Sequence, residues 1–148
     1  MNDFDKALKF VLKWEGFITD DPNDKGGLTI WGISARSHKD AVFEMKRLIE
    51  AEEKDKAFEI CKKIYKSVYW DKTDCNALSY PMNLVVFDTA VNMGRSRADE
   101  IFDQCTGCWR DYLLLRLYTY SKFKQAKLYF RGWANRVLDL YKQIEKEV

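Results

Sequence analysis

One run of the sequence, PMNLVVFDTAVNMG at residues 81–94, is apolar on almost every side when it is drawn as a helix. A helix without a continuous polar face is not stable at a protein surface, because any orientation there would expose apolar side chains to water. Pro81 suits the first position of a helix and Gly94 is a natural terminator. The run therefore predicts a central helix that other elements of the chain must cover.

The covering elements are predicted to be helices as well, because apolar residues recur at spacings of three and four along most of the chain. We expect helices from Asn2 or Asp3 to about residue 15, over 52–69, from a Ser96 cap towards Cys105, over 109–123 and over 133–147, with a short helix capped by Ser34. Turn residues in 17–33 and the β-favouring run 28–31 predict an irregular loop or small β-hairpin after the first helix. The expected fold class is mainly α, with about six to eight helices.

Length and charge narrow the possible functions. The 148 residues suit one domain, and a formal net charge of +2 does not by itself favour a nucleic-acid binder. Residues 109–148 hold nine Lys or Arg against four Asp or Glu, which suits either an anionic polymer such as the bacterial wall or simply solvated helix faces.

No run approaches the ~20 apolar residues of a membrane span, and the start, MNDFDKALKF, lacks a basic secretory n-region. We expect synthesis in the cytoplasm without a classical signal peptide, and no stable membrane insertion.

The cysteines are Cys61, Cys75, Cys105 and Cys108. The last two have the spacing of a metal or redox motif, but a zinc site needs a second pair, and the only histidine, His38, is distant in sequence. We expect reduced thiols, no metal and no cofactor.

The loop that follows the first helix has the residue types that a glycosidase uses. Hydrolysis of a glycosidic bond needs a carboxylic acid that protonates the leaving oxygen, and a second group that assists water or stabilises positive charge. Glu15 ends a predicted helix between aromatic residues, where apolar neighbours and the negative end of the helix dipole favour the protonated acid. Asp24 is the candidate second group, with Asp20 and Asp21 as alternatives, and the Thr29 hydroxyl is suited to hold water.

Beyond these residue types, the run E-G-x-x-x-x-D-P-x-D-x-G-G-x-T-x-x-G-I-S, from Glu15 to Ser34, resembles the N-terminal signature of the glycoside hydrolase family 108 muramidases. These are lysozyme-like proteins of bacteria and phages, some of them described as secretion activators. The resemblance continues in the same order with Tyr69-Trp70, Val86-Phe87-Asp88 through Asn92 to Gly94, and Phe130-Arg131-Gly132-Trp133 with Arg136.

The resemblance implies a lysozyme-like single domain over 1–148, in which 1–94 carries the catalytic loop and buried helix and 95–148 resembles the family's peptidoglycan-binding region. It implies a monomeric peptidoglycan hydrolase that cleaves the β-1,4 bond between N-acetylmuramic acid and N-acetylglucosamine, with Glu15 as general acid. The expected partner is the glycan strand rather than nucleic acid. The wall would be reached by lysis or export, through a holin or a secretion system.

The chain departs from the family's Glu-Gly-Gly-Tyr motif, because Phe17 and Ile18 replace its second Gly and its Tyr. This departure leaves open a non-catalytic wall-binding or secretion-accessory protein. A lytic transglycosylase, which works with one Glu and forms an anhydro ring, is a further alternative. The order of Glu15, Asp24 and Thr29 also resembles that of phage-type lysozymes, although the Thr is one residue closer here. This weaker likeness ranks Asp24 and Thr29 as second-tier catalytic candidates beside Glu15.

Three further residues are candidates for substrate binding. Trp31 is an aromatic residue within the signature, and such rings stack well on sugars. Asp88 and Asn92 lie one turn apart on an otherwise apolar helix and therefore share a face. Both residues suit either contact with substrate or a structural role that holds the active loop, in which a buried Asp88 finds donors such as backbone amides near that loop.

Overall fold

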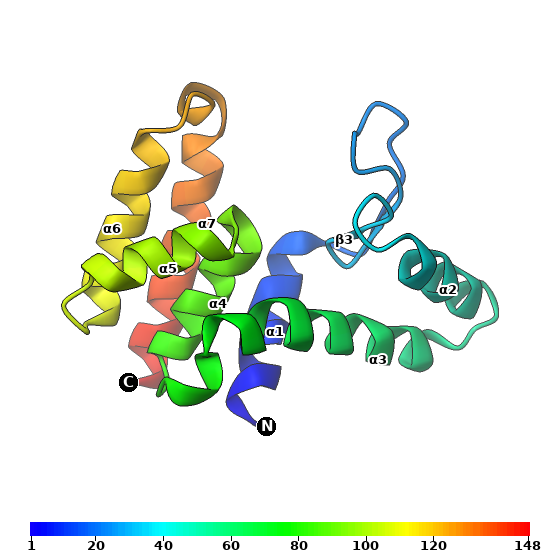
Figure 1. The fold of residues 1–148 in the computed structure, drawn as a ribbon, viewed down its shortest axis with the longest axis horizontal. Coiled ribbons are helices and arrows are strands. Elements are labelled where there is room, and N and C mark those ends of the chain that lie inside the picture. The colour runs from blue at the N-terminus through cyan, green and yellow to red at the C-terminus, as the bar shows by residue number, and fades with distance from the viewer. The chain divides into compact units, whose positions relative to one another are not determined.

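The computed structural model describes residues 1–148 and contains seven α-helices and a small antiparallel sheet (Figure 1). The helices are α1 (Asp3–Glu15), α2 (Lys39–Glu50), α3 (Lys54–Tyr65), α4 (Met82–Met93), α5 (Arg95–Gln104), α6 (Trp109–Ser121) and α7 (Ala126–Glu147). The strands are β1 (Ile18–Thr19), β2 (Thr29–Ile30) and β3 (Ile33–Ser34). Three short helical segments join α3 to α4: a π-helix at Lys66–Trp70 and 3-10 helices at Asp71–Thr73 and Cys75–Ala77. The predicted mainly α class, with a hairpin after the first helix, is confirmed.

Contacts along the chain group its residues into two compact units. We call residues 1–7 with 69–148 the helical unit, and residues 8–68 the hairpin unit. Helix α1 begins in the helical unit and ends in the hairpin unit. The expectation of one domain with a division at residue 94 stays a prediction.

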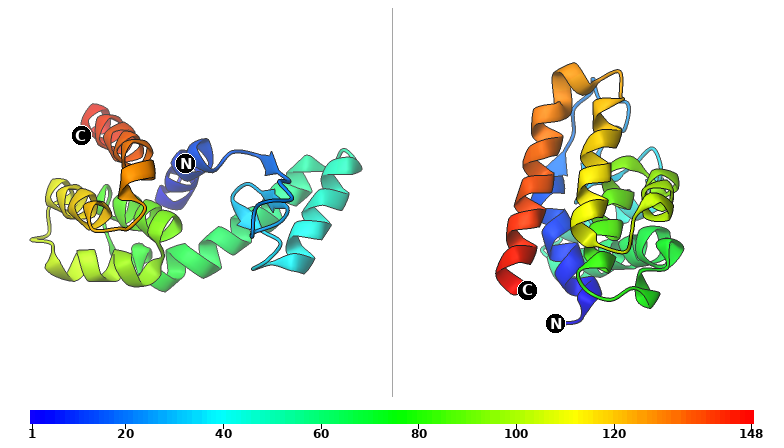
Figure 2. Two further views of the ribbon diagram at one scale, coloured as in Figure 1. Left: turned by 90° about the horizontal axis from the view of Figure 1, so that it is seen from above. Right: turned by 90° about the vertical axis from the view of Figure 1, so that its left-hand side faces the viewer.

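Helix α4 is the centre of the helical unit, as its apolar run predicts. All residues from Asn83 to Ala90 are buried, and α4 packs against both α5 and α6. The helix ends at Gly94, whose φ of +94° is a conformation that side chains rarely adopt. Helices α6 and α7 pack side by side and run in opposite directions (Figures 1 and 2). At the middle of α4, the ring of Phe87 meets those of Phe4 and Trp70 edge to face, and the three centroids are 5.4–5.9 Å apart.

The hairpin unit consists of the second part of α1, the sheet, and the helix pair α2 and α3, which pack against each other (Figure 2). Strand β2 is central and pairs antiparallel with both β1 and β3. Ile30 and Ile33 face each other in the ladder and are buried, and α2 packs on β2 and β3. The sheet is short, so its position depends on this packing more than on its own hydrogen bonds.

Several helix boundaries differ from those expected. Ser34 lies in β3 and the next helix begins only at Lys39, so the cap assigned to Ser34 was wrong. Helix α5 begins at Arg95, which places Ser96 inside it. Helix α7 begins at Ala126 and passes through Gly132, whereas the sequence pattern predicts a start at residue 133. A glycine inside a helix costs only about 1 kcal/mol, and packing of α7 on α6 offsets this cost.

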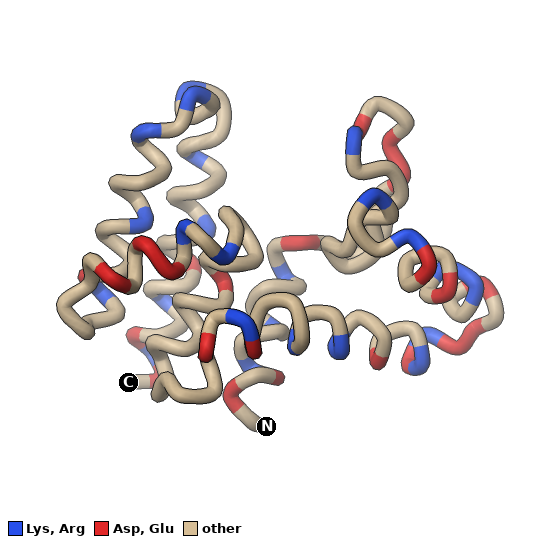
Figure 3. The backbone as a smooth tube through the Cα atoms, viewed as in Figure 1, with Lys and Arg blue, Asp and Glu red and all other residues tan.

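Charged positions are unevenly distributed in the helical unit. Figure 3 shows basic positions at the turn that joins α6 to α7, and acidic positions concentrated on α5. None of the helices is long and apolar enough to cross a bilayer.

Candidate active site

Glu15 is the last residue of α1, and the backbone around it is well defined. The Gly16 amide donates to the Leu12 carbonyl over 3.2 Å, and Gly16 then leaves the helix with a φ of +76°. Asn2 caps the other end of the helix, because its side-chain oxygen accepts the Asp5 amide at 2.8 Å. The carboxylate therefore extends from the end of a rigid element and is half-buried.

A tight turn at Trp31-Gly32 connects β2 to β3 beside this helix end. Both residues have positive φ values, +47° and +79°, as a two-residue type I′ hairpin turn requires. A bulky tryptophan seldom adopts this conformation, so surrounding bonds must hold it. Two hydrogen bonds do so: the Trp31 amide donates to the Phe17 carbonyl at 2.6 Å, and the buried Tyr65 hydroxyl donates to the Trp31 carbonyl at 2.7 Å.

The turn lies directly against the side chain of Glu15. A Cβ atom added at Gly32 would lie 2.9 Å from Glu15 Cβ, 3.0 Å from Glu15 Cγ and 2.6 Å from the Tyr65 hydroxyl oxygen. Real Cβ atoms do not approach other atoms this closely, so only glycine fits between the helix end and Tyr65. Gly32 is thus a positioning residue for the stem of Glu15, because its bare backbone makes the close approach possible, and Tyr65 acts through the turn by its bond to the Trp31 carbonyl.

Aromatic rings surround the turn. The Trp31 ring packs against Phe17 and Phe58, with centroid separations of 5.0 Å and 5.3 Å, and only 8% of the residue is exposed. Trp14 and Phe17, which flank Glu15-Gly16, are 36% and 39% exposed. The Lys54 ammonium lies 4.3 Å from the centroid of the Phe17 ring. The surface near Glu15 therefore offers two partly exposed rings, while the ring of Trp31 supports the hairpin from inside.

Asp24 lies in the exposed loop between β1 and β2, together with Asp20 and Asp21. Its carboxylate accepts the Gly26 amide at 2.9 Å, and its own amide donates to the Asp21 carbonyl at 3.0 Å. The segment that follows is tied to the other side of the hairpin, because the Arg36 amide donates to the Gly26 carbonyl at 3.2 Å. The loop thus holds Asp24 by local turn bonds and leaves its carboxylate in contact with water.

Thr29, the other predicted catalytic residue of this unit, lies in β2 opposite Thr19 and Ser34. It is half-buried, and its hydroxyl donates to the Gly27 carbonyl over a long 3.4 Å. A bond of this length is weak, so the hydroxyl is readily available to a water or a substrate oxygen.

Asp88 and Asn92 lie on α4 in the helical unit, where a buried polar network includes both. Asp88 is fully buried and is ion-paired with Arg116 of α6 and Arg136 of α7, each at 2.7 Å. Arg116 also donates to the Tyr120 hydroxyl at 3.0–3.1 Å, and that hydroxyl donates to the side-chain oxygen of Asn92. The donors that Asp88 finds are therefore guanidinium groups of α6 and α7, not backbone amides near the active loop, so the predicted role of holding that loop was wrong.

The electrostatics of Asp88 follow from this arrangement. Burial by itself would raise the pKa of its carboxyl group, but the two guanidinium groups outweigh burial and the pKa is lowered. The carboxylate is consequently charged at neutral pH and links three helices.

The four cysteines lie in two different environments. Cys61 and Cys75 are buried, and burial raises the pKa of their thiols to about 12 and about 11. Cys108 is exposed at the start of α6, where the backbone amides of Asp111 and Arg110 lower the pKa of its thiol. No group of three or more His, Cys, Asp or Glu side chains lies together in a way that could hold a metal ion.

Sequence reasoning missed the residues that position this site. Tyr65 is one of the regularly spaced apolar residues of α3, and nothing in that pattern indicates its bond to Trp31, 34 positions away. Arg116 is buried in α6, and only its location among apolar residues hinted that it needs an acidic partner.

The architecture, a mainly α chain with a short hairpin after its first helix, is that of a lysozyme-like domain. Comparison with known families gives a match of residues 8–94 to glycosyl hydrolase 108. The chain belongs to the glycosyl hydrolase 108 family, and its class of activity is therefore glycoside hydrolysis. The match covers Glu15, the hairpin and α4.

Among solved structures, SagA from Brucella abortus has the same fold as this chain. The TM-score is 0.74 at 22% sequence identity, over 97% of this chain and 94% of SagA. Among curated protein sequences, none matches this chain.

Proposed function

We propose that this glycoside hydrolase is an N-acetylmuramidase of peptidoglycan, with Glu15 as its general acid. The observation that carries the proposal is the packing of Glu15, at the end of α1, against Gly32, within the part of the chain that matches the family. A general acid has to be held in one place relative to the bond that breaks, and this packing restricts the Glu15 stem.

In the proposed reaction, the protonated Glu15 carboxyl gives its proton to the oxygen of the β-1,4 bond after N-acetylmuramic acid. The bond between that oxygen and the sugar carbon breaks, and the electron pair goes to the leaving N-acetylglucosamine hydroxyl. Water adds to the sugar carbon and gives up a proton, which restores the balance of charge. Trp14 and Phe17 offer partly exposed rings on which sugar faces can stack.

The group that receives the proton of water is proposed to be Asp24, with Asp20 and Asp21 as alternatives in the same loop. All three carboxylates are exposed, and Asp24 is the one whose position is set by turn bonds on both sides. Thr29 is proposed to orient the water, and Trp31 to support the hairpin as well as border the substrate. Asparagine variants of the three aspartates would separate the alternatives, because only the true acceptor lowers turnover strongly when neutralised.

The proposed substrate determines the place of action. The protein would be made in the cytoplasm and act as a monomer on glycan strands of the bacterial wall after lysis or export, through a holin or a secretion system. Substrate contact by Asn92 is part of the proposal, and Asp88 would act through the residues it links rather than by touching sugar, because it is fully buried.

The decisive experiment is Glu15→Gln, which removes the transferable proton and nearly preserves side-chain size. We expect wall clearance in a turbidity assay to fall by about 10²–10⁴-fold, the usual contribution of general acid–base catalysis. The matched control is Glu59→Gln, which changes an exposed glutamate on α3 and should leave turnover unchanged. Circular dichroism would confirm that both variants fold.

Mass spectrometry of digested walls completes the test. Reducing muramic acid ends support a muramidase, whereas anhydro ends would identify a lytic transglycosylase. Absence of any product would favour a non-catalytic wall-binding or secretion-accessory protein, the alternative suggested by Phe17 and Ile18. Clearance by folded Glu15→Gln at the parent rate would remove Glu15 from the mechanism.

A further inference from the structure

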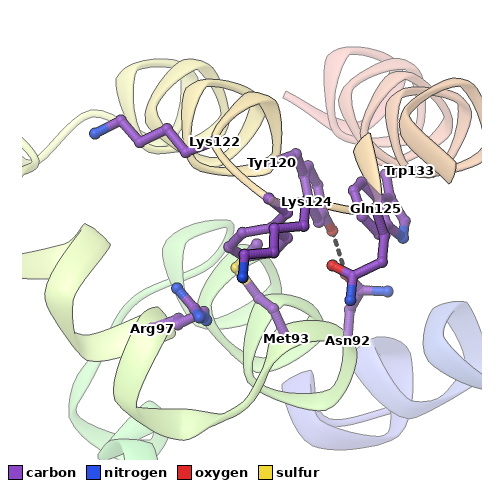
Figure 4. Close-up of a pocket in the computed structure, with 9 residues that line it drawn as sticks. Asn92, Met93, Arg97, Tyr120, Lys122, Lys124, Gln125 and Trp133 are labelled. Carbon is purple, nitrogen blue, oxygen red and sulfur yellow. Dashed lines mark hydrogen bonds between the residues drawn. The ribbon is translucent and has the colours of Figure 1, made fainter. Parts of the chain in front are cut away.

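The helical unit contains a pocket that lies outside the hairpin loop to which the proposed chemistry is assigned, and it shares only Asn92 with the proposed substrate contacts. It has a volume of about 420 Å³ and lies where α4 and α5 meet the turn from α6 to α7 (Figure 4). Its lining residues are Asn92, Met93, Arg97, Tyr120, Lys122, Phe123, Lys124, Gln125 and Trp133. The volume is within the usual range for small-ligand sites, and no acidic residue lines the pocket.

Three cationic residues line the pocket, and two of them, Arg97 and Lys124, are the cations that face it without acidic partners. The side chains of Arg97 and Lys124 form no ion pair or hydrogen bond with the rest of the chain. The Arg97 guanidinium lies 4.4 Å from the centroid of the Phe123 ring, which limits its freedom. Figure 4 shows the charged ends of Arg97 and Lys124 on one side of the pocket, whereas Lys122 extends away from it. The pocket therefore presents positive charge that the fold itself does not neutralise.

The opposite side of the pocket is rigid and offers a further donor. The Tyr120 and Trp133 rings stack at 4.7 Å with an angle of 16°, and Tyr120 is held by Arg116 of the buried network. Because Asn92 accepts the Tyr120 hydroxyl with its side-chain oxygen, its amide nitrogen remains as a donor and forms no hydrogen bond with the chain. Figure 4 shows this contact at the wall of the pocket.

We propose that this pocket binds a carboxylate of the peptide stem of peptidoglycan. Unpaired cations and an amide donor suit an oxyanion, and the neighbouring aromatic rings suit the short aliphatic groups that adjoin each stem carboxylate. The choice of stem peptide over another oxyanion rests on the proposed function. Wall phosphates share the oxyanion chemistry, and the experiment distinguishes the two sources.

The test is titration calorimetry of the intact protein with three probes: muramyl tripeptide, the same tripeptide with its carboxyl groups amidated, and glycerol 3-phosphate. We expect the tripeptide to bind and its amide to bind at least about tenfold more weakly, because charge-assisted hydrogen bonds are lost. If the unmodified protein bound the tripeptide and its amide with equal affinity, the proposal would be overturned. Binding of glycerol 3-phosphate in place of tripeptide would overturn the assignment to the stem.

Variants place the binding in the pocket. The double variant Arg97→Gln with Lys124→Gln changes two exposed side chains and is expected to weaken tripeptide binding at least about tenfold. The matched control, Lys142→Gln with Lys146→Gln, removes two exposed charges near the other end of α7 and is expected to leave the affinity unchanged. An equal loss in both variants would overturn the pocket as the site.

A failure of the pocket proposal can be distinguished from a failure of the proposed function. Tripeptide binding by a protein that releases no wall fragments would contradict only the muramidase proposal. Wall cleavage without tripeptide binding would contradict only the pocket.

Discussion

At the scale of single residues, Gly32 shows how a sequence motif acquires a physical meaning. Its φ of +79° explains why glycine is favoured, but Gly27 has a similar φ of +67° and open space around it. What distinguishes Gly32 is the close approach of Glu15 and Tyr65, which leaves no room for a Cβ atom. The residue is therefore required for the position of Glu15 as well as for the turn.

Gly32→Ala tests this distinction against Gly27→Ala. Both changes carry the cost of a left-handed alanine, about 1–2 kcal/mol, and Gly32→Ala adds an overpacking cost of about 1–3 kcal/mol. We expect urea unfolding to show the larger loss for Gly32→Ala. We also expect its wall clearance to fall by up to about 10²-fold, because displacement of Glu15 by about 1 Å misaligns the acid. Equal stability and equal activity of the two variants would show that the contact with Glu15 does not matter.

At the scale of elements, Asp88 joins helices that hydrophobic packing alone would leave free to slide. Helix α4 is apolar nearly all round, so its rotation and register are weakly specified by a pattern of apolar faces. The ion pairs of Asp88 with Arg116 and Arg136 specify one arrangement of α4, α6 and α7. The same network holds Tyr120 at the wall of the pocket, so packing and the proposed binding site share one support.

Asp88→Asn is expected to lower the free energy of unfolding by about 3–5 kcal/mol, since it leaves two buried guanidinium groups without their carboxylate. The pKa of Asp88 is lowered in the folded protein, so its contribution is present above the ordinary aspartate value of about 3.9 and is lost as pH falls through the folded value. Urea unfolding at several pH values should therefore show the gap between parent and variant narrowing only below about pH 4. Asp103→Asn, an exposed change on α5, is the control and should have little effect at any pH. A gap that narrows already near neutral pH would contradict the assignment.

At the scale of the whole molecule, charge is distributed unevenly along the chain. The near-neutral total of +2 conceals a basic excess in residues 109–148, and the turn from α6 to α7 gathers part of it (Figure 3). Peptidoglycan carries carboxylates, and many walls also carry phosphates, so this region is complementary to the proposed substrate. Such attraction between exposed charges is long-ranged and sensitive to salt.

Binding of the protein to wall fragments is accordingly expected to weaken several-fold between about 0.02 M and about 0.3 M salt, as the Debye length falls from about 20 Å to below 10 Å. Sedimentation with Glu15→Gln protein would measure it without digesting the walls. Walls stripped of their anionic polymers are the control, and their binding should depend less on salt. An affinity that stays flat over this range would mean that the basic region takes no part in wall binding.

Helices and turns can be predicted from the sequence where the residues of one element are enough to specify it. The extent of α1 and α4, the glycines that end them and the turn residues after α1 are all read from neighbouring residues, because helix period and turn conformation depend on the local chain. Neighbouring residues do not predict the start of α7 or the absence of a helix at Ser34. At these two places, packing on other elements outweighs weak local preferences.

In the candidate site, too, some features can be predicted from the sequence and others depend on tertiary packing. The sequence by itself determined which residue types stand at the spacing of the motif, namely Glu15, Asp24 and Thr29. It did not determine how their side chains are placed relative to one another. Tertiary structure alone decided that Glu15 and Tyr65 both meet Gly32, that two arginines surround Asp88, and that Arg97 and Lys124 line one pocket. Each of these contacts joins positions far apart in the chain. Their energies depend on burial and on distances of a few ångströms, which exist only once the helices have packed.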